Sequence, residues 1–119
     1  NTYEQIAVRQ EKDFMTEMDF AQKHIMNDPF GIEIDLDALP NVPSSAMTLS
    51  GFSVEQLRQF IHVFGQNTNA SYLHICEGAP DLCDEKNPQM IGKLMGYLIT
   101  DFIKAKNILS IYETNYLLS

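Results

Sequence analysis

The segment FGIEIDLD, residues 30–37, decides how the rest of the sequence is interpreted. After Gly31, apolar and acidic residues alternate with a period of two, which is the pattern of a β-strand with one apolar and one acidic face. We therefore predict a strand over residues 31–37. Glu33, Asp35 and Asp37 would project from the same face, with neighbouring carboxylates about 6.6 Å apart because a strand rises about 3.3 Å per residue.

Three helices are predicted from apolar residues that recur at spacings of three and four. They cover residues 13–26, 54–64 and 88–105. The middle helix has the clearest start, because Ser53 and Gln56 form a capping box ahead of its apolar face. Asn87 is expected to cap the last helix, with Pro88 at its first position.

A second, shorter strand is predicted over residues 71–76, and residues 38–51, which contain two prolines, are expected to form an irregular loop. The order helix, strand, helix, strand, helix is typical of crossover units in a parallel sheet, and so of an α/β fold. A parallel sheet is covered on both faces, and two strands do not make a stable sheet alone. We therefore expect this chain to be a fragment of a larger domain.

Size and charge exclude several classes of protein. The 119 residues, of which 45% are hydrophobic, suffice for one domain, and a formal charge of -8 repels nucleic acid and anionic lipid. No apolar run reaches the length of a membrane span and no signal peptide begins the chain, so we expect a cytoplasmic protein with no nucleic-acid or membrane partner. Cys76 and Cys83 are expected to be reduced thiols.

The three carboxylates of residues 33–37 permit two interpretations. They line the solvated face of an edge strand, or the aspartates at its carboxyl end bind Mg²⁺ or Mn²⁺ through hard oxygen ligands. Glu77 directly follows the second strand, and in a parallel sheet it would lie on the same rim as Asp37. It is either a surface residue or a carboxylate that binds an amidine or guanidinium through paired hydrogen bonds.

The order of these motifs resembles the ureohydrolases, the family of arginase, agmatinase and formimidoylglutamase. Residues 34–37, IDLD, are similar to a strand motif of that family whose two aspartates ligate a binuclear manganese centre. Residues 39–45, LPNVPSS, are similar to the loop that follows, and residues 51–53, GFS, to the start of the next helix. Residues 73–80 are similar to a late strand that ends in Glu-x-Asn-Pro. The resemblance covers residues 30–105.

This resemblance implies the C-terminal part of a single three-layer α/β/α domain with an arginase-like parallel sheet. It implies hydrolysis of a linear C–N bond in a cationic amidine or guanidino substrate, formimidoylglutamase-like or arginase-like, by hydroxide that bridges two Mn²⁺. Asp35 and Asp37 would be metal ligands, and Glu77 would orient the substrate. The complete enzyme is expected to be a homo-oligomer.

The chain also departs from the family pattern. Glu33 stands where the family tends to have a small residue, and Gly78 and Ala79 replace an apolar residue and Asn, so the substrate stays open. The upstream motifs Gly-Gly-x-His and Asp-x-His-x-Asp are absent from this chain. The remaining metal ligands are therefore expected in the rest of the parent domain, and the isolated chain is expected to be inactive.

Two other classes of protein fit parts of the sequence. A noncatalytic acidic α/β interaction domain would fold without responding to Mn²⁺. A phosphoacceptor domain of the receiver type also carries an acidic metal-binding cluster, but it needs five strand-helix units and a lysine at a strand end.

Overall fold

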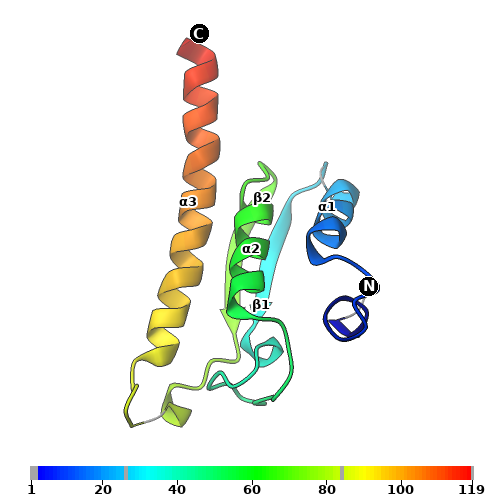
Figure 1. Ribbon diagram of the computed structural model, residues 1–119. Helices are drawn as coiled ribbons and strands as arrows, with labels where there is room; N and C mark the ends of the chain where they lie inside the picture. Colours follow the sequence, from blue (N-terminus) through cyan, green and yellow to red (C-terminus); the bar gives the residue numbers. More distant parts are fainter. Residues whose placement is uncertain (1–2, 26, 84, 119) are drawn as a thin grey trace.

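The computed structural model describes residues 3–25, 27–83 and 85–118, with side chains up to residue 108. It is an α/β structure with two strands and three long helices (Figure 1). These elements are α1 (Phe14–Ile25), β1 (Phe30–Asp35), α2 (Val54–Gly65), β2 (Ala70–Cys76) and α3 (Met90–Leu118). Three short helical turns accompany them, namely η1 (Glu4–Val8), η2 (Leu36–Ala38) and η3 (Pro80–Leu82).

Strands β1 and β2 form a parallel pair, as the sequence predicts. The pairing runs from Phe30 opposite Ala70 to Asp35 opposite Cys76, with an irregular register between Phe30 and Gly31. Helix α2 connects the two strands, because a parallel pair needs a crossover connection. The unit β1-α2-β2 therefore brings the carboxyl ends of both strands to one edge of the sheet.

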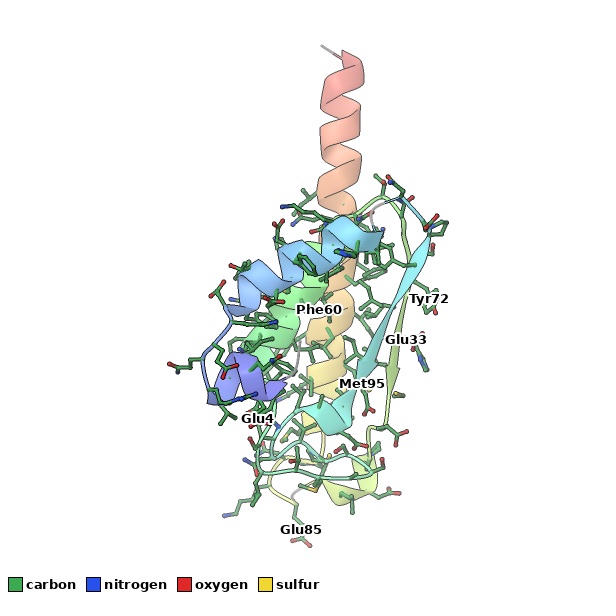
Figure 2. The ribbon with its side chains drawn as sticks, turned by 90° about the vertical axis from the view of Figure 1, so that its right-hand side faces the viewer. Glu4, Glu33, Phe60, Tyr72, Glu85 and Met95 are labelled. Atoms are coloured by element: carbon green, nitrogen blue, oxygen red, sulfur yellow. The ribbon has the colours of Figure 1, made fainter. Side chains whose placement is uncertain are left out.

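All three long helices lie on one face of the sheet (Figure 2). The core between helices and sheet contains alternate residues of β1, Ile32 and Ile34, together with Ile61 of α2 and Leu98 of α3. Burial of each such side chain contributes about 1.5–3 kcal/mol. Within the described residues no helix covers the opposite face of the sheet. Of the three expected layers, helix, sheet and helix, this chain therefore supplies two, the sheet and one layer of helices.

Helix α2 begins and ends where local sequence signals place it. The Gln56 amide donates to the Ser53 hydroxyl at 3.0 Å and the Ser53 amide donates to the Gln56 side chain at 2.9 Å, which confirms the capping box. At the other end, a Cβ on Gly65 would lie 2.9 Å from Cβ of Ala105. Glycine therefore permits the close approach of α2 to α3.

The strand expected over residues 31–37 ends early, at Asp35. The Asp35 carboxylate accepts a hydrogen bond from the Asp37 amide at 2.9 Å and caps the turn η2. Such a local side-chain bond competes with continuation of a strand. The expectation that Glu33, Asp35 and Asp37 share one strand face was therefore wrong for Asp37, which lies in η2.

The last helix also differs from its expected range of 88–105. It starts at Met90, whose amide donates to the Asn87 carbonyl at 3.2 Å, so Pro88 is not its first residue. It continues to Leu118 because no glycine or proline follows Gly96 to interrupt it. Figure 1 shows its C-terminal half extending beyond the sheet. The elements α1, α2 and β2 lie within one residue of the ranges expected for them. Met26, the expected last residue of the first helix, lies outside the described residues.

Two findings bear on the classes of protein considered above. The described ranges contain two strands, so they do not support a receiver-type domain with five strand-helix units. Among the described residues, none of the helices combines the length and apolar character that crossing a membrane requires.

Candidate active site at the carboxyl ends of the strands

The three carboxylates singled out in the sequence follow the two strands. Asp35 ends β1, Asp37 lies in η2, and Glu77 comes directly after β2. Because the strands are parallel, these residues lie at the same edge of the sheet, as expected for Asp37 and Glu77.

Ser45 joins two of these carboxylates. Its Oγ donates to Oε2 of Glu77 and lies 3.2 Å from Oδ2 of Asp37. Its amide donates to the Glu77 carbonyl at 3.0 Å. The next amide, of Ala46, donates to Oδ1 of Asp37 at 2.8 Å. Residues 45 and 46 therefore present a set of donors to Asp37 and Glu77.

The loop that carries these donors is closed at its base. The Phe52 amide donates to the Ala38 carbonyl at 3.0 Å, and a Cβ on Gly51 would lie 2.1 Å from that same oxygen. Glycine is therefore required where the two ends of the loop meet. The Ala79 amide donates to the Pro43 carbonyl at 3.0 Å, which ties the loop to the segment after β2.

Residues inside the loop anchor it as well. Leu39 and Val42 are buried in the core, and the Asn41 amide donates to the Thr48 carbonyl at 2.9 Å. The loop predicted over residues 38–51 is thus irregular but held in place, which fixes the position of Ser45.

Glu77 adopts an unusual backbone conformation. Its φ is 67°, in the left-handed region that non-glycine residues rarely adopt. Such a conformation costs roughly 1–3 kcal/mol and persists only where its surroundings impose it. The Ser45 amide and a β-bridge between Ser44 and Gly78 supply those constraints on either side of Glu77.

The charge at this edge is negative. The hydrogen bond from the Ala46 amide lowers the pKa of the Asp37 carboxyl below its ordinary value, because it favours the ionised form. None of the ion pairs within the described part of the chain involves Asp35, Asp37 or Glu77. The edge therefore offers carboxylates to a cation.

Asp35 and Asp37 fit part of a metal site. Both supply hard oxygen ligands, and both carboxylates accept backbone hydrogen bonds, which orient ligands in metal sites. Within the ranges that the structure describes, no three His, Cys, Asp or Glu side chains come together to hold a metal ion. A metal ion held by Asp35 and Asp37 would therefore need further ligands from outside the described residues.

Glu33 belongs to a different cluster, on the uncovered face of the sheet. Its Oε2 lies 2.5 Å from Nδ1 of His74, and the ring of Tyr72 lies over Gly31. Figure 2 shows Glu33 and Tyr72 on the side away from the helices. Two hydrogen bonds lower the pKa of the Glu33 carboxyl, of which the bond with His74 has the larger effect and the bond with Tyr72 the smaller. Glu33 is therefore a partner of His74 in this structure.

Sequence reasoning missed the roles of Ser45 and Ala46. Ser45 lies in a segment recognised as similar to a family loop, but only the closed loop shows that its hydroxyl meets Asp37 and Glu77. The sequence offers one signal for this role of Ser45, namely that it is a hydroxyl residue in the loop that follows an acidic strand end, where functional residues often lie.

Comparisons by sequence give no relatives, since no family model and no curated protein matches the chain. Solved structures do match it. Arginase from Bacillus subtilis superposes with a TM-score of 0.67 and 18% identity, over 78% of this chain and 32% of that one. Formiminoglutamase from Trypanosoma cruzi superposes with a TM-score of 0.66 and 15% identity, over 81% of this chain and 33% of that one.

A second structure of the T. cruzi enzyme, with Mn²⁺, has a TM-score of 0.62 and 16% identity, over 82% of this chain and 34% of that one. At such identities the likeness concerns the fold. The chain spans about a third of the length of the structures it matches. It therefore has an arginase-like α/β fold and accounts for about a third of a domain of that kind.

Proposed function

We propose that this chain is the C-terminal part of a binuclear-manganese hydrolase that cleaves a linear C–N bond in an amidine or guanidino compound. The observation that carries the proposal is the convergence of Asp37 and Glu77 on Ser45, at the edge of the sheet where Asp35 also lies. The arginase-like fold supports it, because ligands of open parallel sheets bind at the carboxyl ends of the strands.

Asp35 and Asp37 would hold the metal. The T. cruzi formiminoglutamase structure with Mn²⁺ supports manganese as the ion. When bound, a pair of Mn²⁺ ions supplies a hydroxide nucleophile at neutral pH and stabilises the charge that develops on the substrate. Two aspartates do not fill two coordination spheres, so the other ligands would come from the remainder of the parent domain.

Glu77 would bind the cationic end of the substrate. Ser45 donates to one oxygen of this carboxylate, Oε2, which leaves Oε1 and the second lone pair of Oε2 for the substrate. An amidinium or guanidinium group presents two N–H donors in one plane, which match a carboxylate. Formimidoylglutamase-like and arginase-like substrates both fit this description.

The experiment uses the complete protein that carries this chain, purified with Mn²⁺. We expect hydrolysis of arginine to urea and ornithine, or of N-formimino-L-glutamate to formamide and glutamate. Asp19→Asn is the control for substitutions of Asp35 and Asp37, since it changes an exposed carboxylate of α1 that pairs with Lys23. Wild-type protein that hydrolyses neither compound would contradict the proposal, and the absence of Mn²⁺ binding as well would favour a noncatalytic acidic domain.

The isolated 119-residue chain provides a second test. Because it lacks the other ligands, we expect it to bind Mn²⁺ weakly and to be inactive. A calorimetric titration that shows two tight Mn²⁺ sites in this chain would contradict the incomplete ligand set.

A further inference from the structure

We propose that Ser45 is a positioning residue, whose hydroxyl fixes the Glu77 carboxylate for the substrate. This inference rests on the proposed function. Among the described residues, Ser45 Oγ is the hydrogen-bond partner of the Glu77 carboxylate, and it is also 3.2 Å from Asp37. One side chain of the loop therefore lies between the proposed substrate carboxylate and a proposed metal ligand.

The two carboxylates do not depend on Ser45 equally. Asp37 keeps the hydrogen bond from the Ala46 amide at 2.8 Å when the hydroxyl of Ser45 is removed. Glu77 loses its side-chain partner. Removal of the hydroxyl is therefore expected to free the Glu77 side chain while Asp37 stays in place.

A serine hydroxyl carries a single proton, so it donates to one carboxylate at a time. Donation to Glu77 leaves Oδ2 of Asp37 facing the Ser45 oxygen without a proton between them. The Ser45 hydroxyl is therefore assigned to the Glu77 carboxylate, and the Ala46 amide to that of Asp37.

The backbone at Ser45 is held independently of its hydroxyl. The Ser45 amide donates to the Glu77 carbonyl at 3.0 Å, and Ser44 forms a β-bridge with Gly78. The side chain of Ser45 is exposed, so its replacement by alanine leaves no buried cavity. We therefore expect Ser45→Ala to fold as the wild type does.

The test measures kcat, KM and Mn²⁺ content of the complete protein with arginine and with N-formimino-L-glutamate. In Ser45→Ala we expect kcat/KM to fall about tenfold or more, mainly through KM, because a hydrogen bond to a charged group is lost. Mn²⁺ content stays unchanged. Ser45→Thr keeps the hydroxyl and restores most of the activity.

Ser71→Ala is the matched control, since it removes an exposed hydroxyl at the opposite end of β2. Its kinetics should equal those of the wild type. An active wild type with unchanged Ser45→Ala kinetics overturns the role of Ser45 alone, and so does equal impairment of Ser45→Ala and Ser45→Thr. Loss of Mn²⁺ in Ser45→Ala also overturns it, since the residue would then act through the metal. A wild type without activity on either compound overturns the proposed function and the role of Ser45 together.

Discussion

Asp37 and Glu77 meet at the hydroxyl of Ser45, which donates to Oε2 of Glu77 and lies 3.2 Å from Oδ2 of Asp37. Each follows a different strand, and the loop between η2 and α2 folds back over both strand ends to bring them together. A parallel sheet accounts for their common edge, and the loop accounts for their contact. Neither carboxylate has an ion-pair partner in the described part of the chain, so Asp37 is free for the proposed metal and Glu77 for the proposed cationic substrate.

Glu77→Gln in the complete protein should lower activity while metal is retained. The amide cannot offer two acceptor oxygens to a cation, so we expect kcat/KM to fall about 10-fold to 100-fold. Steady-state kinetics with atomic absorption of Mn²⁺ measures both quantities. Activity within a factor of two of the wild type would show that Glu77 does not bind the substrate.

Leu98→Ala tests the core that supports the sheet. Leu98 is fully buried between the helices and the sheet, so we expect a loss of about 2–5 kcal/mol in the free energy of unfolding. The neighbouring Ile99 has 45% of its surface exposed and serves as the control, with an expected loss within about 0.5–1 kcal/mol for Ile99→Ala. Urea unfolding of the 119-residue chain, in which these exposures hold, measures both free energies. Equal losses would contradict the packing of α3.

Glu33→Gln tests the cluster on the uncovered sheet face. Hydrogen bonds from His74 and Tyr72 lower the pKa of the Glu33 carboxyl from its ordinary value of 4.5. A carboxyl with a lowered pKa stabilises the folded state above the unfolded pKa, and this contribution is lost as the pH falls through the folded pKa.

We therefore expect Glu33→Gln to lower the urea midpoint at pH 6, with a difference from the wild type that shrinks as the pH falls below 4.5. His74→Gln should show the same trend, because it removes the partner. A difference that does not change with pH would show that Glu33 stabilises the fold through something other than its charge.

Much of the fold is predictable because its signals are local. The alternation around Ile32 and Ile34 identifies β1, since the period of two reports directly which face is buried. The capping box of Ser53 and Gln56 locates the start of α2. The parallel order of the strands then places Glu77 at the edge occupied by Asp37.

What the sequence did not predict depends on contacts between distant segments or on competing local bonds. Asp37 leaves the strand because its amide bonds to Asp35, and the alternating pattern does not distinguish this turn from a further strand residue. The role of Ser45 depends on the β-bridge between Ser44 and Gly78, which no periodicity reports. The helix expected over residues 88–105 continues to Leu118, because no glycine or proline after Gly96 ends it.

The proposed metal ligands give the most direct test of the account. The measurement is the Mn²⁺ content of the complete protein, compared with that of Asp35→Asn, Asp37→Asn and the Asp19→Asn control, each after dialysis against metal-free buffer. Because Asp35 and Asp37 are the proposed ligands, we expect the wild type and the control to retain Mn²⁺ and the other two variants to lose it. Equal Mn²⁺ content in all four proteins would contradict the assignment of a manganese site to this edge of the sheet.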